Sequence, residues 1–371
     1  MTSWIQKGKR SAAADLAPVV RALKSSDYSV RVSFSEEEIP QKSDQKSIIL
    51  DGTSFDSIES IYIKLKSCLD QTPVPFTLNV TGLGRFDVKS VSTEQQEKRM
   101  GGRICLVTGA AQGFGEGIAR ELAEAGATVV VADINEPLAR SVSESLNEQY
   151  GPGTAWSVRV DVGDECSVSK MVEETVLTFG GLDVLVSNAG ILRAGGLDDI
   201  TLEVFELVTR INYTAFFLVT KYGSRPMKLE SRFNPDYTAD IIQINSKSGL
   251  EGSNRNFAYA GSKFGGIGLV QSFAKELVTD RIKVNAICPG NYYEGPLWSD
   301  PEKGLFVQYL KAGKVPDAKS VEDVYRYYVE KVPMRRGCSP LDVTRAIFYC
   351  IEQSYETGQA IPVTGGQNML K

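Results

Sequence analysis

The feature that most restricts the fold is a regular alternation of strand-like and helix-like segments from Arg103 onward. Short runs rich in Val and Ile, bounded by Gly, Asn and Asp, predict buried strands, and segments with helical spacing separate them. Expected strands cover 104–109, 127–133, 154–160, 183–188, 240–245, 282–287 and 359–363, and expected helices cover 114–125, 136–148, 168–179, 202–222, 258–278 and 340–351. This alternation predicts an α/β fold with a doubly wound, Rossmann-type parallel sheet covered on both faces.

The first 100 residues follow a different and less regular pattern. Residues 47–50 and 76–80 are typical of short strands, and apolar residues from Ile58 to Leu69 recur with helical spacing. The polar stretch 92–99 suggests a linker or a connecting helix. Because 371 residues exceed one average domain, we expect a small N-terminal αβ region over 1–100, a structural or oligomer-contact appendage of unknown role, and a larger domain over 101–371.

Histidine is absent from the chain. Zinc sites with imidazole ligands, Ser-His-Asp hydrolysis and every histidine general base are therefore excluded, and we expect no metal site. Acid-base chemistry has to come from Tyr, Lys, Asp, Glu or Cys.

Charge and cysteine usage restrict the partners. The net charge of −5 argues against a nucleic acid or an anionic membrane surface. The N-terminal segment lacks the apolar core of a signal peptide, and no apolar run approaches the roughly 18 residues of a membrane span. The six cysteines are scattered and form no CxxC pair, which is typical of reduced thiols. We expect a cytoplasmic protein that acts on a small molecule and binds neither nucleic acid nor membrane.

A glycine-rich turn links the first strand of the larger domain to the helix after it. Glycines permit a tight turn and a close approach of the backbone to a pyrophosphate, and the helix start adds free N–H groups and a positive dipole end. A purely structural turn is the alternative, but the position between strand and helix favours dinucleotide binding. The candidate cofactor-binding residues here are Gly109, Gln112, Gly113, Phe114 and Gly115.

Asp133 closes the second expected strand, roughly twenty residues after the glycines, where dinucleotide-binding domains place an acidic residue. A carboxylate there accepts hydrogen bonds from the adenosine ribose and repels a 2′-phosphate. No Arg or Lys lies within the glycine turn to bind such a phosphate. The sequence therefore favours NAD over NADP. The alternative is that Asp133 only caps the next helix.

Three residues form a candidate acid-base centre. Ser246 follows an apolar strand, at the edge where strand ends meet the ligand crevice, and Tyr259 and Lys263 share one helix face four residues apart. A nearby ammonium and a positively charged nicotinamide both favour the tyrosinate over a phenol, whose free pKa is about 10. Tyr259 is then the proton acceptor, and Ser246 hydrogen-bonds the reacting oxygen. The Tyr-x-x-x-Lys spacing is common by chance and gains its value from the other motifs.

Together, and in this order, these motifs resemble the short-chain dehydrogenase/reductase family over residues 101–371. The resemblance implies that Asp161 and Val162 flank the adenine and that Lys263 also holds the nicotinamide ribose. It implies that Asn212 holds a water linking Lys263 to solvent; the alternative is that Asn212 marks only a helix kink or a polar core position. Further cofactor-cleft residues on the same basis are Asn188, Ala189, Gly190, Pro289 and Gly290.

One position departs from the family pattern. The family often places Thr four residues after the Gly of Pro-Gly, where it holds the nicotinamide carboxamide. Glu294 occupies that position here, so we expect a backbone group or Asn291 to substitute.

A closer resemblance within the family is to the sorbitol-6-phosphate 2-dehydrogenases. It is carried by IIQINSKSG, YAGSKFGGIGLVQS, the PGN turn, YYVEKVPMRRGC and TGQAIPVTGGQ. It implies interconversion of D-sorbitol 6-phosphate and D-fructose 6-phosphate with NAD. Lys247 and Arg255 lie near the catalytic residues in sequence and are candidate phosphate ligands, or else solvated surface cations. The Tyr-rich segment 291–338 suggests a lid over the substrate, or packing against the sheet.

Two other functions stay open: a reductase for another carbonyl, such as a sugar acid or a 3-oxoacyl thioester, and an NAD-sensing module without turnover. The intact catalytic set argues against the sensor, which has no need of acid-base groups. The expected helix 202–222 is apolar on several faces, and in the family this helix packs against its twin from another subunit. We therefore expect a homodimer or a homotetramer.

Overall fold

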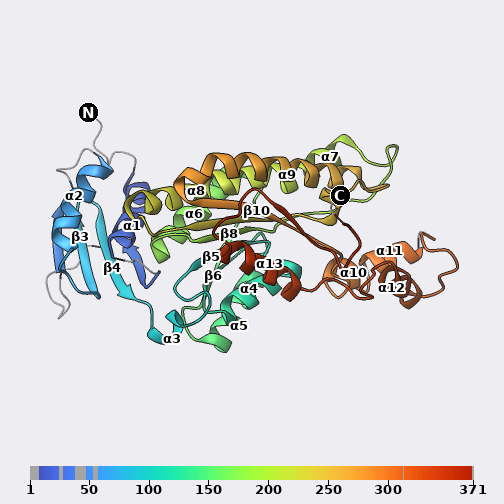
Figure 1. Cartoon of the computed structure of the whole chain (residues 1–371), viewed down its shortest axis with the longest axis horizontal. Coiled ribbons are helices and arrows are strands. Elements are labelled where there is room, and N and C mark those ends of the chain that lie inside the picture. Colours follow the sequence, from blue (N-terminus) through green and yellow to red (C-terminus); the bar gives the residue numbers. More distant parts are fainter. Residues whose placement is uncertain (1–7, 25–27, 38–46, 53–56, 312, 370–371) are drawn as a thin grey trace.

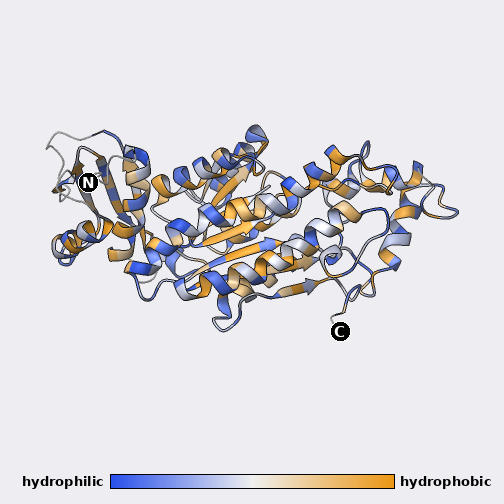
Figure 2. Ribbon diagram, turned by 90° about the horizontal axis from the view of Figure 1, so that it is seen from above, coloured by the Kyte–Doolittle hydropathy of each residue, from blue (hydrophilic) through white to orange (hydrophobic). Residues whose placement is uncertain are grey.

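The computed structural model describes residues 8–24, 28–37, 47–52, 57–311 and 313–369. Two β-sheets organise this part of the chain (Figure 1). A four-stranded sheet lies at one end of the elongated molecule, a seven-stranded sheet fills the middle, and the segment 291–338 forms the opposite end. In the middle part, hydrophobic residues concentrate in the strands and on the helix sides that face them (Figure 2). No helix in the described ranges is long and apolar enough to cross a membrane.

The larger sheet is parallel throughout, with the strand order β11-β10-β9-β8-β5-β6-β7. Its central strands are buried along their whole length, as expected for a sheet covered by helices on both faces. The strands are β5 (Ile104–Thr108), β6 (Thr128–Asp133), β7 (Ala155–Arg159), β8 (Val184–Ser187), β9 (Ala239–Ile244), β10 (Ile282–Pro289) and β11 (Ala360–Val363). The predicted doubly wound fold is confirmed.

Helices cover the two faces of this sheet in separate apolar cores. One core contains α4 (Gly113–Glu124), α5 (Glu136–Tyr150) and α13 (Pro340–Glu352). The other contains α6 (Glu165–Phe179), α8 (Ala215–Phe233) and α9 (Phe257–Leu277).

The expected helix 202–222 differs from the structure in two ways. It is divided into α7 (Leu202–Thr209), a π-helical turn (Arg210–Thr214) and α8. In addition, α8 continues through Pro226 to Phe233. The apolar periodicity fades before that end because the buried residues of the last turns include the polar Glu230 and Ser231.

The strand order changes direction at β5. The strands β6 and β7 follow on one side of β5, and β8, β9 and β10 lie on the other. At such a switch point the loops after two neighbouring strands diverge and leave a crevice at the carboxyl ends of the strands. The glycine turn after β5 and the loop 188–190 after β8 both border this crevice.

The N-terminal unit is a second sheet with the order β1-β4-β3-β2, in which only β2 and β3 are parallel. Its elements, with the connecting α3, are α1 (Lys9–Lys24), β1 (Val30–Ser35), β2 (Ser47–Asp51), α2 (Ile58–Leu69), β3 (Phe76–Thr81), β4 (Gly84–Ser90) and α3 (Thr93–Gln96). The expected strands at 47–50 and 76–80 and the helix between them are confirmed. The elements α1, β1 and β4 were not predicted.

A buried ion-pair cluster joins this unit to the amino-terminal ends of the parallel strands. Arg21 of α1 donates to both carboxylate oxygens of Asp183 (2.8 Å each) and to Glu230 of α8 (2.8 Å). All three side chains are at most 1% exposed. Asp183 also accepts the backbone N–H of Ile104 (2.7 Å) at the start of β5. The N-terminal unit therefore covers the amino-terminal edge of the larger sheet, at the end of the molecule opposite to the segment 291–338 (Figure 1).

The segment 291–338 has an apolar cluster of its own, separate from the two cores of the sheet. Its helices are α10 (Pro296–Ser299), α11 (Leu305–Lys311) and α12 (Val321–Glu330). Tyr293 lies at the centre, with ring centroids 5.1 Å from Trp298 and 5.8 Å from Phe306. The aromatic residues of this segment thus pack mainly against one another rather than against the sheet.

Candidate active site

The glycine turn between β5 and α4 combines two left-handed glycines with a free helix start. Gly109 (φ +65°) and Gly113 (φ +64°) hold backbone conformations that other residues rarely adopt. A Cβ on Gly115 would overlap the carbonyl oxygen of Gly109, so this glycine permits close packing of α4 on β5. Around Gly113 the space is open: an added Cβ would meet nothing nearer than Pro296, at 3.9 Å. Gln112 caps α4 without a side-chain bond to the helix amides, which leaves N–H groups for an anion.

Asp133 ends β6 beside this turn. One carboxylate oxygen accepts the N–H of Ala111 (3.0 Å) in the glycine turn, and the other accepts the N–H of Asn135 (2.9 Å). The N-cap of α5 is Asn135, so Asp133 does not serve as the helix cap. A carboxylate has about four acceptor positions, and two hydrogen bonds leave room for a ribose hydroxyl.

Hydrogen bonds tie together the loops after β5 and β8. The side-chain amide of Asn188 donates to the carbonyl oxygens of Thr108 (2.9 Å) and Gly109 (3.0 Å). The hydroxyl of Thr108 accepts the N–H groups of Asn188 (3.0 Å) and Ala189 (3.1 Å). A Cβ on Gly190 would lie 3.8 Å from Nζ of Lys263. The loop 188–190 therefore runs from the glycine turn to the acid-base residues.

Asp161 and Val162 lie just after β7, on the Asp133 side of the crevice. The N–H of Val160 donates to the carbonyl oxygen of Asp133 (2.9 Å), which holds the two strand ends together. Asp161 accepts the N–H of Gly163 (2.9 Å) through its side chain. Val162 is buried and offers an apolar surface at this edge.

Ser246, Tyr259 and Lys263 meet at the carboxyl end of β9. The hydroxyl of Ser246 lies beside the phenol of Tyr259 and accepts the N–H of Ser248 (3.1 Å). Nζ of Lys263 lies 5.6 Å from the centre of the Tyr259 ring and donates to the carbonyl oxygen of Ile244 (2.9 Å). The structure thus brings the three predicted residues into one group.

Burial governs the protonation of this group. It raises the pKa of Tyr259, and the hydrogen bond from Ser246 opposes that rise. Burial also lowers the pKa of Lys263 to about 8. The chain alone therefore does not produce the lowered phenol pKa that we expected from Lys263.

Asn212 lies in the π-helical turn and is buried. Its side-chain oxygen accepts the N–H of Ile191 (2.8 Å), and its side-chain nitrogen donates to the carbonyl oxygen of the same residue (2.8 Å) and to Ser262 (3.2 Å). Both structural alternatives, a helix irregularity and a polar core position, are therefore observed. Single π-turns frequently occur at functional sites, and this one lies beside the loop 188–190.

The Pro289-Gly290 turn follows β10, and the N–H of Gly290 donates to the carbonyl oxygen of Val363 (2.9 Å) in β11. The side chain of Asn291 donates to the Tyr293 hydroxyl (3.3 Å). The carboxylate of Glu294 lies against Gly337, where the aromatic segment returns to the sheet. Both side chains support the segment itself, so backbone groups of the turn remain the expected carboxamide anchor.

The two predicted phosphate ligands differ in their surroundings. Lys247 is half-buried next to Ser246. Burial lowers its pKa, the charge of Glu251 opposes this, and the charge of Lys331 lowers the pKa further. Arg255 is ion-paired with Asp199 (2.6 Å). Lys247 therefore is the freer of the two cations.

The sequence suggested the aromatic segment as a lid but did not single out Lys314 and Lys331 within it. The ring of Tyr292 lies 5.0 Å from that of Phe114 at the start of α4, so the segment touches the glycine turn. Lys331 lies within electrostatic range of Lys247, and Lys314 within range of Arg255. The only signal in the sequence was that lysines occur among the tyrosines of this segment. That signal does not indicate how far these lysines lie from Ser246.

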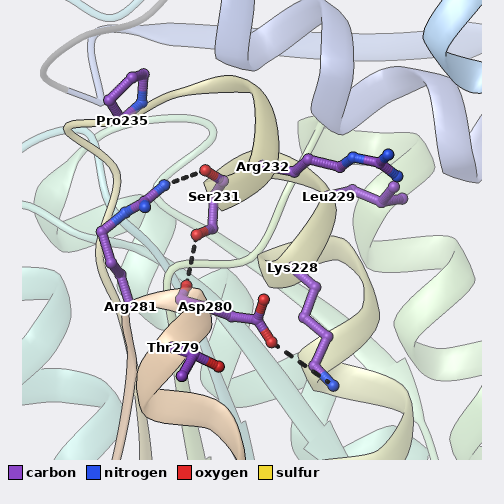
Figure 3. Close-up of a pocket in the computed structure, with 8 residues that line it drawn as sticks. All are labelled: Lys228, Leu229, Ser231, Arg232, Pro235, Thr279, Asp280 and Arg281. Atoms are coloured by element: carbon purple, nitrogen blue, oxygen red, sulfur yellow. Dashed lines mark hydrogen bonds and ion pairs between the residues drawn. The ribbon is translucent and has the colours of Figure 1, made fainter.

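A surface cavity of about 540 Å³ lies away from the crevice, beside the end of α8 (Figure 3). Its polar groups are largely engaged with one another. Arg281 donates to the carbonyl oxygens of Ser231 and Asn234, and Nζ of Lys228 lies 3.8 Å from the carboxylate of Asp280. None of the predicted catalytic or cofactor residues lines this cavity, and we assign it no part in catalysis.

Comparisons with known proteins agree with this geometry. A family model of short-chain dehydrogenases matches residues 103–298, so the match begins after the N-terminal unit. The chain is 37% identical over 271 residues to the sorbitol-6-phosphate 2-dehydrogenase of Escherichia coli (strain K12), covering 72% of this chain and 99% of that protein. It is 33% identical to the 3-oxoacyl-acyl-carrier-protein reductase of Aquifex aeolicus, covering 73% and 99%. The crystal structure of a sorbitol-6-phosphate 2-dehydrogenase from Erwinia amylovora, 38% identical, superposes with a TM-score of 0.65 over 72% of this chain and 100% of that one.

Proposed function

Because the chain belongs to the short-chain dehydrogenase family, we propose that it oxidises D-sorbitol 6-phosphate to D-fructose 6-phosphate in a reversible reaction with NAD. The observation that carries this choice of substrate is Lys247, a half-buried cation adjacent to Ser246 that has no carboxylate within 4 Å in the described chain. A cation in that position suits a phosphate at the end of the substrate remote from the reacting carbon. The relatives that act on sorbitol 6-phosphate support the same choice.

In this proposal the acid-base work belongs to Tyr259. It takes the proton of the substrate hydroxyl, and Ser246, which lies beside Tyr259, orients the reacting oxygen. Lys263 places a positive charge one helical turn from the phenol, and Asn212 fixes the loop at Gly190 beside that lysine. When bound, NAD supplies the hydride acceptor.

The residues present suit a dinucleotide. The free N–H groups at the start of α4 and the open space at Gly113 would hold the pyrophosphate. Asp133, which has two hydrogen bonds and spare acceptor positions, would hold the adenosine ribose and disfavour a 2′-phosphate. Loop 188–190, Asp161, Val162 and the Pro289-Gly290 turn would complete the cleft.

The proposal extends to the organisation of the chain. Residues 101–371 act as the NAD-binding domain, the segment 291–338 acts as a lid over the substrate, and residues 1–100 form a separate region. Much of the apolar surface expected on helix 202–222 is covered within the chain, as Val208 and Phe216 show. Phe205, Phe217 and Phe264 nevertheless stay exposed on α7, α8 and α9, which supports a homodimer or a homotetramer through these helices.

A reductase for another carbonyl is the second candidate, favoured by the identity of 33% with a 3-oxoacyl thioester reductase. One experiment separates the two. Purified protein is assayed for NADH formation from D-sorbitol 6-phosphate and for NADPH or NADH consumption with a 3-oxoacyl thioester. We expect NAD-linked oxidation of the sugar-alcohol phosphate with little use of NADP. Efficient thioester reduction without sorbitol 6-phosphate oxidation would replace the proposal by the reductase.

A further inference from the structure

Three lysines from separate parts of the chain are linked through Lys331, which lies within electrostatic range of Lys247 at the mouth of the crevice and of Lys314. Lys247 follows β9, Lys314 lies between α11 and α12, and Lys331 comes directly after α12. In the described part of the chain, none of the three has a carboxylate within 4 Å, although many other cations are ion-paired. These three charges thus lack the close carboxylate partners that cations such as Arg21 and Arg255 have.

Aromatic rings hold two of these lysines in place. Nζ of Lys314 lies 4.0 Å from the ring centroid of Tyr309, and Nζ of Lys331 lies 4.0 Å from that of Tyr327. The rings of Tyr309 and Tyr328 are 5.5 Å apart, which places both lysines on one aromatic cluster. A cation–π contact is worth only about 0.5–1 kcal/mol at exposed sites, and it orients the ammonium group without neutralising its charge.

The C-terminal tail brings this cluster next to the catalytic loop. Val332 packs so closely on Gly365 that a Cβ there would lie 2.9 Å from it. A few residues on, Asn368 donates to the carboxylate of Glu251 (2.6 Å), and the N–H of Glu251 donates to the carbonyl oxygen of Lys247 (3.2 Å). These contacts form a continuous path from the residue after Lys331 to Lys247.

The charge of Lys331 acts on the pKa of both other lysines, in addition to burial and other nearby charges. Beyond the effect of burial, the charge of Lys331 lowers the pKa of Lys247, against the opposing charge of Glu251. Burial, then Arg255 and Lys331, lower the pKa of Lys314. Gathering like charges costs free energy that a bound anion recovers.

We propose that Lys247, Lys314 and Lys331 form a three-lysine clamp for the phosphate of the substrate, so that two residues of the aromatic segment set the preference for a phosphorylated sugar alcohol. Three ammonium groups suit the several acceptor oxygens of a phosphate dianion. Arg255 stays outside the clamp because Asp199 holds its guanidinium (2.6 Å). That this phosphate belongs to a sugar alcohol rests on the proposed function.

The test compares Lys314→Ala/Lys331→Ala with Lys319→Ala, which removes a lysine from the same segment just before α12 and outside the clamp. Losing charge-assisted hydrogen bonds worth about 1.5–3 kcal/mol corresponds to roughly ten- to a hundredfold. We expect the ratio of kcat/KM for D-sorbitol 6-phosphate to that for D-sorbitol to fall by this factor in the double variant, mostly through KM. Lys319→Ala should keep the wild-type ratio. Equal ratios in the two variants would refute the clamp.

A second readout needs no turnover. Inorganic phosphate should raise the unfolding temperature of the wild-type protein and of Lys319→Ala, and it should raise that of the double variant much less. If the wild type does not use sorbitol 6-phosphate but shows this difference, the clamp stands as an anion site and the proposed substrate is wrong. If phosphate stabilises all three proteins equally, the clamp itself is wrong.

Discussion

Arg21, at the amino ends of the parallel strands, and Lys247, at their carboxyl ends, differ in their charged partners. At the amino ends, Arg21 is enclosed by Asp183 and Glu230, and all three side chains are at most 1% exposed. At the carboxyl ends, Lys247 lies within electrostatic range of Lys331, and neither lysine has a carboxylate within 4 Å among the described residues. The N-terminal unit lies at one end of the sheet, and the aromatic segment lies at the other (Figure 1).

This difference distinguishes a charge that stabilises the fold from charges that are available to bind a ligand. A buried cation with all its hydrogen bonds made is costly to disturb, because removing it leaves carboxylates buried without a partner. Cations without a nearby carboxylate do not stabilise the fold in this way. Their charges lower the free energy of the protein only when an anion binds beside them. Changes at the amino ends should therefore alter stability and leave chemistry intact, and changes at the carboxyl ends should do the reverse.

The largest expected effect is at the carboxyl ends of the strands. Tyr259→Phe keeps the ring and removes the proton acceptor, so turnover should fall by about 10²–10⁴-fold, the range typical of a general acid-base group. The urea midpoint and the affinity for NAD should change little. Steady-state kinetics measure the turnover, and titration followed by fluorescence measures the affinity for NAD. A variant that keeps near-normal turnover would remove Tyr259 from the mechanism.

A change at the amino ends of the strands should lower the free energy of unfolding. Arg21→Met leaves Asp183 and Glu230 buried and unpaired, and breaking a buried pair costs about 3–5 kcal/mol. Urea unfolding should show this loss, whereas kcat of the remaining folded protein should stay close to that of the wild type.

Two further variants make this prediction specific. Arg21→Met/Glu230→Gln removes one of the stranded charges and should recover part of the stability. Arg10→Ala, on the same helix as Arg21, breaks an exposed ion pair with Glu173 of α6 (3.2 Å), which is worth only about 0–1 kcal/mol. An Arg21→Met variant as stable as Arg10→Ala would show that the buried cluster does not hold the two parts together.

The smallest of these effects is the pH dependence of the reaction rate, which comes from Tyr259 at the carboxyl ends of the strands. Oxidation needs Tyr259 as the phenolate, and burial raises its pKa. Below that pKa the rate of oxidation should therefore rise by about tenfold per pH unit, and carbonyl reduction, which needs the phenol, should decline at alkaline pH. Profiles of kcat/KM in both directions test this. An oxidation rate that does not change from neutral to alkaline pH would contradict the assignment of the base.

The sequence predicted most where the pattern is local. The strands and helices after Arg103, the glycine turn, and the grouping of Ser246, Tyr259 and Lys263 all follow from periodicity and from the rule that strand ends meet at one edge. The π-helical turn at Asn212 did not follow, because an apolar pattern of helical period continues through it.

Other features depend on contacts between distant parts of the chain. The helix α1 contains Pro18 in its interior, which argues against a helix locally, and it is stabilised by packing against α6 and α8. The pairing of Arg21 with Asp183 joins residues 162 positions apart. The pairing of Arg255 with Asp199 joins residues 56 positions apart, and it changes which cation is free to bind a phosphate. No sequence pattern predicts such pairs.

The central claim is that the carboxyl edge of the sheet binds a phosphorylated sugar alcohol. The most direct test is the ratio of kcat/KM for D-sorbitol 6-phosphate to that for D-sorbitol, measured with NAD and the wild-type protein at one ionic strength. Charge-assisted contacts to the phosphate predict that kcat/KM for D-sorbitol 6-phosphate exceeds that for D-sorbitol by roughly ten- to a hundredfold. Equal use of the two substrates would contradict the account, because the unpaired lysines at the crevice mouth would then contribute nothing to recognition.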